Sequence, residues 1–178
     1  ITSISSLTKL ILEDAFIVFF FLQAEDGRRG RDVTGVQSVL FDLINALAEF
    51  GSKPIYLKAD ATDLKSFNGA INELLETYPI INGVVHSAIV LKDQSISQMS
   101  DSAFCETLAA KVDISVNIQS VFDKRDLDFI LFFSSIISFF KTPGQSNYSA
   151  GCTFKDSLAS SLTSSGKCLS NLGRASCG

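Results

Sequence analysis

The stretch that decides the fold is FILFFSSIISFFKTPGQSNYSAGCTF, residues 129–154. Residues 128–133 are almost wholly apolar and rich in β-formers, so they are predicted to form a strand that is covered on both faces. Ser134 and Ser135 follow this strand, and after a polar loop Tyr148 opens a predicted helix. The strand end should therefore bring a serine hydroxyl near a tyrosine hydroxyl, where open α/β sheets bind ligands. Such a pair suits carbonyl reduction, in which one group polarises the oxygen and another protonates it.

Two neighbouring segments carry a family resemblance. INGVVHSAIVLKDQSIS (residues 81–97) and LAAKVDIS (residues 108–115) resemble the ketoreductase domains of modular polyketide synthases, within the short-chain dehydrogenase/reductase superfamily. The resemblance covers about residues 51–159 and rests on several ordered motifs at matching spacing. HSAIVL and GQSNYSAGCTFKDSLA are similar to the ketoreductases of trans-acyltransferase assembly lines. The resemblance implies reduction by NADPH of a β-ketoacyl chain tethered to an acyl carrier protein, with other synthase domains as partners.

Composition narrows the class of protein. A chain of 178 residues is one domain's worth of sequence, and 46% hydrophobic residues are enough for a core. With a net charge of −4 the chain has no broad basic surface, so a nucleic-acid partner is not expected. The longest apolar run, residues 15–22, is too short to span a bilayer, so no membrane partner is expected. Four cysteines without a CxxC pair, beside one histidine, favour neither a zinc site nor a disulfide scaffold, and a reducing cytoplasm is the expected setting.

Alternating strands and helices predict an α/β fold with a Rossmann-like, doubly wound parallel sheet. The expected elements are an amphipathic helix over 35–50, a strand over 53–59, a helix over 64–77 capped by Asp63, a strand over 82–87, a helix from the Ser100 cap to about 122, and the strand and helix of the opening stretch. No GxGxxG motif precedes the second helix. The first βαβ unit, whose Gly-rich loop cradles a cofactor pyrophosphate, is therefore expected to be missing and the sheet incomplete.

Both ends of the chain depart from the family pattern. Residues 1–34 are interpreted as an atypical, non-native segment, because residues 19–32 resemble translated sequencing-adapter sequence; a divergent native N-terminus is the alternative. Residues 35–160 are predicted to be a partial ketoreductase domain. Residues 161–178 are predicted to be an atypical tail, without a periodic apolar face and without the tryptophan-containing strand that the family places next. The chain is accordingly expected to be a fragment that is inactive alone.

The resemblance implies roles for three catalytic side chains. Tyr148 matches the general acid, and Ser135 matches the hydroxyl that binds the substrate carbonyl oxygen. Lys111 matches the lysine that lowers the tyrosine pKa and binds the nicotinamide ribose. Bringing a tyrosine from its free pKa of ~10 to about 7 takes roughly 4 kcal/mol of stabilisation of the phenolate. Ser134 is the alternative to Ser135, and would otherwise be a strand-end hydroxyl bonded to backbone.

Cys152 is the fourth catalytic candidate and a departure from the family. It stands where ordinary superfamily members carry the lysine of YxxxK, and where polyketide ketoreductases carry an asparagine that helps hold a relay water. Cysteine is only a weak donor and acceptor. The lysine swapped to position 111 favours a polyketide ketoreductase over a free-standing short-chain dehydrogenase. Retention of Ser135, Tyr148 and Lys111 favours a catalytic domain over a non-catalytic structural module of a synthase.

Two segments match cofactor contacts in the family. Asp60 and Ala61 follow the third strand, where an acidic residue contacts adenine; a turn or helix-start aspartate is the alternative reading. Ser87 and Ala88 match the loop beside the nicotinamide. His86, before them, is interpreted as a structural residue at a strand end. No metal site is expected, and a phenylalanine-rich face is interpreted as core; its members are Phe132, Phe133, Phe139 and Phe140.

A partial motif bears on stereochemistry. Leu91, Lys92 and Asp93 align with the LDD motif that marks one stereochemical class of polyketide ketoreductase. Phe140, eight residues before Tyr148, replaces the tryptophan that marks the opposite class. The resemblance therefore implies a D-configured β-hydroxyl product, with a solvated turn aspartate as the alternative.

Overall fold

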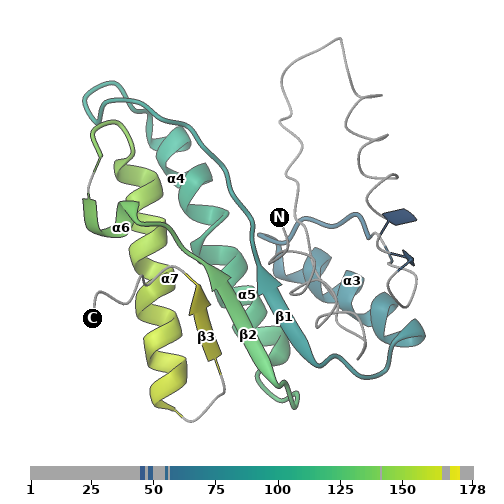
Figure 1. Cartoon of the computed structure of the whole chain (residues 1–178). Coiled ribbons are helices and arrows are strands. Elements are labelled where there is room, and N and C mark those ends of the chain that lie inside the picture. Colours follow the sequence, from purple (N-terminus) through teal and green to yellow (C-terminus); the bar gives the residue numbers. More distant parts are fainter. Residues whose placement is uncertain are drawn as a thin grey trace.

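Three parallel strands form the sheet in the order β1-β2-β3. The structure, a computed structural model, describes residues 45–46, 48–49, 55, 57–140, 142–165 and 169–172. The strands are β1 (Gly83–His86), β2 (Phe129–Phe133) and β3 (Leu169–Leu172), and Figure 1 shows their carboxyl ends at one edge. In register, Val84 faces Ile130, which faces Leu169 on the other side. The parallel α/β arrangement agrees with the predicted fold class, and β1 and β2 lie within the predicted strands.

In the part of the chain that the structure describes, five helices with defined bounds accompany the strands. They are α3 (Leu64–Thr77), α4 (Asp101–Ala109), α5 (Val112–Phe122), α6 (Ile137–Phe140) and α7 (Ser146–Ser164). The predicted caps are confirmed: the Asp63 side chain accepts from the Ser66 amide, and the Ser100 side chain accepts from the Ala103 amide. Within the described part of the chain, no helix combines the length and apolar character needed to cross a membrane.

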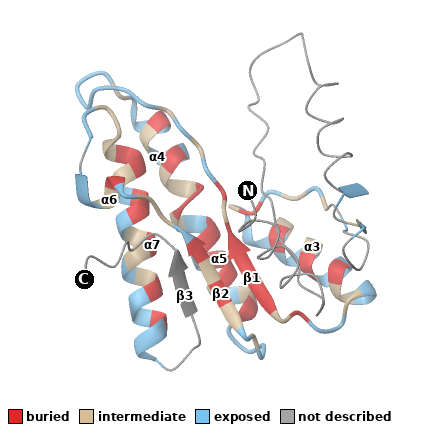
Figure 2. Cartoon of the chain, viewed as in Figure 1, coloured by how far each residue is buried: buried red, intermediate tan, exposed pale blue. Residues whose placement is uncertain are grey.

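The main core lies between the sheet and helices α3, α5 and α7. Ile130 and Phe132 of β2 are buried, whereas Phe129, Leu131 and Phe133 on the alternate positions are only partly covered or exposed. Figure 2 shows the buried residues running along β1 and the helix sides that face the sheet. The helical members of this core are Phe67, Ile71, Leu74, Ile114, Ile118, Phe122, Ala159 and Leu162. This packing holds the two strand ends and the start of α7 in one place.

The helix predicted from Ser100 to about 122 is interrupted at Lys111. The structure has two helices, α4 and α5, separated by Ala110 and Lys111. The Lys111 amide donates to the Leu108 carbonyl at 2.8 Å, a bond that spans three residues instead of four. The prediction of one continuous helix was wrong because propensity does not register this tight turn, which puts Lys111 between the two helices.

Two strand predictions also need correction. Within the strand predicted over 53–59, the described residues Ile55 and Leu57–Ala59 are not in a strand. A strand needs a neighbour to pair with, and in the described part of the chain β1 pairs only with β2. Conversely, β3 forms at Leu169–Leu172, where no strand was expected; four residues are too few to display a periodic pattern.

Two further predictions meet the structure only in part. Asn45, Ala46 and Ala48 are helical, in agreement with the end of the helix predicted over 35–50. The remainder of that helix and residues 1–34 lie outside the described residues. The phenylalanine face is not a core face: Phe132 is buried, but Phe133, Phe139 and Phe140 are 43%, 61% and 72% exposed. Phe133 points to the opposite side of β2 from Phe132, and the other two belong to the single short turn of α6.

Candidate active site

Polar side chains gather at the carboxyl edge of the sheet. Ser134 and Ser135 follow β2, Ser87 follows β1, and Tyr148 stands in the first turn of α7. Because β1 and β2 are parallel, these strand ends meet at one edge. Ser134 is bonded to backbone, since its hydroxyl donates to the Cys152 carbonyl at 3.4 Å. Ser135 is the serine whose side chain hydrogen-bonds Tyr148.

Tyr148 is nearly buried and has Cys152 as its other polar neighbour. Tyr148, Cys152 and Ile137 form a small buried cluster beside the main core. Burial is the largest cause that raises the pKa of Tyr148, to about 12; negative charge on Cys152 and a hydrogen bond with it add to the rise. The Ser135 hydrogen bond acts in the lowering direction. The expected lowering of the Tyr148 pKa is therefore not present in this arrangement, because burial and Cys152 outweigh the stabilising contact.

Lys111 lies over the Tyr148 ring at the break between α4 and α5. Its Nζ is 4.7 Å from the ring centroid, and the side chain is almost fully buried. Burial lowers the Lys111 pKa, while Cys152 and a hydrogen bond with Lys155 raise it. Gly151 makes the approach possible: a Cβ at that position would lie 2.8 Å from Cβ and Cγ of Lys111. The structure thus brings together Ser135, Tyr148, Lys111 and Cys152, the four residues proposed from sequence.

Lys155 belongs to the same group and was missed in the sequence. Its side chain is 0% exposed, and its Nζ donates to the carbonyl oxygens of His86, at 3.4 Å, and of Phe133, at 3.2 Å. Burial and the charge of Lys111 are the largest causes that lower its pKa, to about 6. Helical periodicity could have found it, because positions three after Cys152 and seven after Tyr148 share one helix face.

His86 is a buried strand-end residue, as interpreted from sequence. Its Nδ1 accepts from the Ala88 amide at 3.4 Å, and its ring meets Phe132 edge-on with centroids 5.9 Å apart. Burial, followed by the charges of Lys155 and Lys111, lowers its pKa to about 2. His86 is therefore neutral at any working pH, and its Nε2 has no hydrogen-bond partner in the described part of the chain.

Asn147 fixes the backbone at Tyr148 through hydrogen bonds, and the sequence did not predict this role. Its side-chain nitrogen donates to the Lys92 carbonyl at 3.1 Å and to Thr107 Oγ1 at 3.0 Å. Its side-chain oxygen accepts from the Tyr148 amide at 2.8 Å. One buried amide thus joins the loop after β1, helix α4 and the start of α7. The sequence signal was only its adjacency to Tyr148, which does not distinguish a brace from a helix-start residue.

The loop that carries Asp93 is fastened to the loop before α7. Gln145 Nε2 donates to Asp93 Oδ2 at 2.6 Å, and the Gln94 amide donates to the Gly144 carbonyl at 2.9 Å. Gly144 has φ of 86°, a conformation that favours glycine. Lys92 pairs with Glu106 of α4. Asp93 is thus exposed but held in a defined position, unlike a freely solvated turn aspartate.

The predicted cofactor residues lie around this group. Asp60 is exposed, and its carboxylate accepts from the amide and hydroxyl of Thr62, the largest causes that lower its pKa. The buried Ala61 accepts at its carbonyl from Asn117 Nδ2 at 2.8 Å, which ties this turn to α5. Ser87 and Ala88 directly follow β1, beside the His86 ring. Asp60 and Ala61 stand just before α3, on a different part of the chain from Tyr148 in α7.

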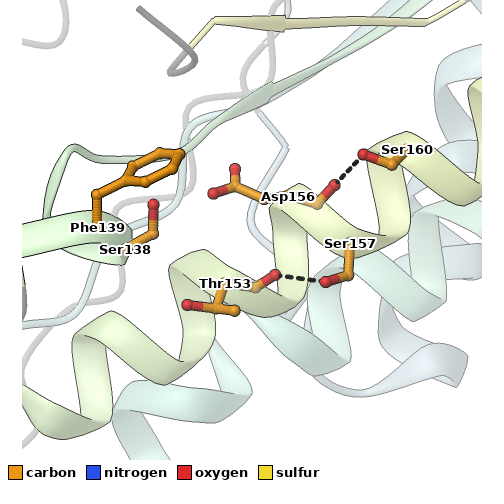
Figure 3. Close-up of a pocket in the computed structure, with 6 residues that line it drawn as sticks. All are labelled: Ser138, Phe139, Thr153, Asp156, Ser157 and Ser160. Carbon is orange, nitrogen blue, oxygen red and sulfur yellow. Dashed lines mark hydrogen bonds between the residues drawn. The ribbon is translucent and has the colours of Figure 1, made fainter.

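A hollow lies on the other side of α7 and has different chemistry. Figure 3 shows its lining, in which Ser157 and Ser160 bond back to the carbonyls of Thr153 and Asp156 in their own helix. The α7 residues that line the hollow lie on a different face of the helix from Tyr148, Cys152 and Lys155. The hollow therefore contains none of the candidate catalytic groups. Among the described residues, no group of three or more His, Cys, Asp or Glu could hold a metal ion.

Comparison with known proteins gives a consistent result. The family model described as "KR domain" matches residues 26–173. Polyketide synthase PksN of Bacillus subtilis (strain 168) is 46% identical over 137 residues, which is 77% of this chain and 2% of that protein. Polyketide synthase ThaG of Burkholderia thailandensis is 38% identical over 149 residues, or 84% of this chain and 2% of that protein. The chain thus spans about 2% of the length of these curated relatives.

Solved structures are similar to the described fold. A ketoreductase domain from the bacillaene assembly line superposes with a TM-score of 0.68 at 27% identity, covering 83% of this chain and 36% of that one. An N-terminal ketoreductase from the macrolactin assembly line gives a TM-score of 0.67 at 27% identity, covering 83% and 29%. The predicted Rossmann-like class, and the resemblance stated from the motifs, are confirmed by these matches.

Proposed function

This chain belongs to the KR domain family, and on that premise we propose that it is the part of a β-ketoacyl reductase that carries the proton-donating machinery. The substrate is a β-ketoacyl chain tethered to an acyl carrier protein, and the product is a β-hydroxyacyl chain. The observation that carries the proposal is the grouping of Ser135, Tyr148 and Lys111 at one sheet edge, from three different elements.

The proposed roles follow from the contacts. Tyr148 keeps its proton at neutral pH, because its pKa is raised, and can donate it to the alkoxide that forms when hydride reaches the carbonyl carbon. Ser135 already hydrogen-bonds the phenol, so both hydroxyls can converge on one substrate oxygen. Lys111, over the Tyr148 ring, stabilises negative charge that remains on the phenol after proton transfer.

The residues present fit the two ends of a nicotinamide dinucleotide. Asp60 offers an exposed, ionised carboxylate to an adenine amino group, and Lys111 offers an amine to ribose hydroxyls. Ser87 and Ala88 follow β1 beside the reacting edge. When bound, the cofactor supplies the hydride. NADPH is the proposed form, on the family resemblance. The pyrophosphate cradle is the part that this sequence does not offer, since it contains no GxGxxG motif.

Partners and setting are proposed on the same basis. The relatives PksN and ThaG are named as polyketide synthases, so the expected partners are an acyl carrier protein and other synthase domains. Cys105 and Cys152 are free thiols, which accords with a reducing cytoplasm. The rival function is a non-catalytic structural module, which would have no use for the Ser135, Tyr148 and Lys111 grouping.

The test is reduction of a β-ketoacyl thioester, followed by NADPH oxidation. We expect no turnover by the chain itself, and turnover once a family-like first strand, Gly-rich turn and helix precede about residue 35. In that extended version Tyr148→Phe should lower turnover at least roughly a hundredfold, the usual scale for losing a general acid.

Tyr78→Phe provides the matched control, because Tyr78 ends α3 away from the sheet edge. Tyr148→Phe with near-parental turnover would remove Tyr148 from the mechanism. An extended version that folds and binds NADPH but reduces nothing would favour the structural module.

We also propose a D-configured product. Asp93 is held by Gln145 three residues before Tyr148, so its loop borders one side of the reacting edge and can bias which carbonyl face meets the hydride. Chiral chromatography of the reduced thioester measures the outcome. A dominant L-hydroxy product would show that the partial motif, with Lys92 in place of its first acid, does not carry the usual meaning.

A further inference from the structure

A lysine in the middle of a buried helix face needs an explanation. Lys155 lies on the α7 stripe that packs on the sheet, between Cys152 and Ala159, and no part of it reaches solvent. Burying a charged amine is costly unless it is paired. Its Nζ donates to two backbone carbonyls, those of His86 at the end of β1 and Phe133 at the end of β2. Lys155 therefore spans the two strands at the edge where the candidate site lies.

The number of bonds matches a neutral amine. An uncharged lysine has two N–H groups and one lone pair, whereas an ammonium has three N–H groups and none. Two carbonyls take the two N–H groups, and Lys111, a donor, forms a further hydrogen bond with the amine. A lone pair can accept from the Lys111 ammonium, but a third N–H would face a like charge. The geometry thus suits a pair of amines that together carry one positive charge, with that charge on Lys111.

We propose that Lys155 is a positioning residue, a neutral amine that anchors on the two strand ends and accepts a hydrogen bond from Lys111, holding the Lys111 ammonium over Tyr148. The inference rests on the proposed function, because the purpose of the arrangement is to present one cation to the tyrosine. Lys155 itself touches neither substrate nor cofactor in this assignment.

The surrounding charges agree with this assignment. Helix α7 contributes Cys152 and Asp156, which raise the Lys155 pKa, but burial and Lys111 dominate and lower it to about 6. From β1, His86 faces the pair and stays neutral. In turn, the hydrogen bond with Lys155 raises the Lys111 pKa against the effect of burial. Removing Lys155 should therefore make Lys111 a weaker base, and a fall in pH below about 6 should protonate Lys155 and break the contact.

The test is a pH titration of the chain with ¹³C,¹⁵N-labelled lysine, followed by NMR of the side-chain Cε and Nζ signals. We expect one lysine that is neutral at pH 8 and gains its proton near pH 6, and whose signal disappears in Lys155→Met. In Lys155→Met the Lys111 signal should titrate at lower pH than in the parent. Lys155→Gln, which keeps two N–H groups and an acceptor, should restore the Lys111 titration at least in part.

Lys124→Met, at an exposed lysine, is the control and should leave the Lys111 titration unchanged. A parent chain in which every lysine is charged at pH 8 would overturn the proposal, and this needs no variant to fold. An unchanged Lys111 titration in a folded Lys155→Met chain would also overturn it. Neither readout requires reductase activity, so failure of the proposed function remains distinguishable.

Discussion

At the scale of residues, burial and the neighbouring Cys152 together set the acidity of the tyrosine. The thiol stands where the family resemblance implies an asparagine, and its negative charge and hydrogen bond both raise the Tyr148 pKa. A tyrosine whose pKa is about 12 is a weaker acid than a free tyrosine. Tyr148, the proposed proton donor, is therefore a weaker acid in this arrangement.

Cys152→Asn should therefore lower the pH at which Tyr148 ionises, because a neutral amide removes the like-charge effect. Absorbance of the phenolate during an alkaline titration measures the shift, with Tyr148→Phe identifying the signal. Activity of the extended version should be kept or improved. Loss of activity on this change would mean that the pocket has adapted to the thiol, and Cys152→Ala separates the loss of charge from the gain of the amide.

Lys155 ties stability to pH. Its pKa is about 6 when folded, against ~10.4 for a free lysine, so between these values the unfolded chain binds more protons than the folded one. The resulting loss of folding stability is complete below about pH 6, and it disappears as the pH rises through the pKa that Lys155 has in the unfolded chain. At pH 7 this difference in proton binding destabilises the folded chain by an amount on the order of 4 kcal/mol. The two hydrogen bonds to carbonyls offset roughly 2 kcal/mol of that loss.

Lys155→Met should accordingly raise the free energy of unfolding at pH 7 by about 2 kcal/mol and flatten its rise between pH 6 and 10. Urea unfolding at several pH values measures both effects. A variant whose stability follows the parent's pH dependence would contradict the folded-state pKa.

At the scale of elements, the contact between α7 and the α4–α5 break places the reacting groups. Gly151 lets the helix approach Lys111 so closely that any Cβ would overlap its side chain. Asn147 then fixes the first turn of α7 against α4 and the loop after β1. The position of Tyr148 relative to Lys111 is therefore set by backbone-level contacts, which leave little freedom to adjust.

Gly151→Ala should destabilise the chain by about 1–3 kcal/mol, because the added methyl group must displace Lys111 or the helix. Gly69→Ala is the matched control: Gly69 is a helical glycine with nothing within 4 Å of a new Cβ, and alanine there should stabilise by roughly 0.5–1 kcal/mol. Thermal unfolding of both variants checks the pair. Equal effects would show that helix propensity, and not the contact with Lys111, governs position 151.

At the scale of the whole molecule, the described residues supply one side of the proposed reductase site. The edge carries the proposed proton donor, its two neighbouring lysines and the Asp60 turn. Asp60 and Lys111 offer contacts to the ends of a dinucleotide, but most contacts to the pyrophosphate come from a Gly-rich turn in this class of fold.

The chain by itself should therefore bind NADPH weakly or not at all. Fluorescence titration of the purified chain tests this, with the extended version as the positive control. Micromolar binding by the chain alone would contradict the prediction and would show that another segment takes the place of the turn.

Much of the fold and the outer form of the site could be predicted from sequence. Local sequence patterns determine features that extend over only a few residues. Such features are the helix caps at Asp63 and Ser100, the apolar runs of β1 and β2, and the apolar stripe on α3. Ser135 and Tyr148 were likewise identified, because spacing after a strand places them near its carboxyl end. Matching motifs identified Lys111, although periodicity gave no reason for it to reach the tyrosine.

Only the tertiary structure decided how these parts meet. The close approach of Gly151 to Lys111, the burial of Lys155 between two strand ends, and the hydrogen bond between Gln145 and Asp93 each depend on residues far apart in the chain. Helical periodicity puts Lys155 on the same face as Tyr148 and Cys152, but no local property shows that its neighbours are two carbonyls and another amine. The sequence determined which chemical groups are available; packing determined which of them are charged, because desolvation and neighbouring charges exist only once distant segments come together.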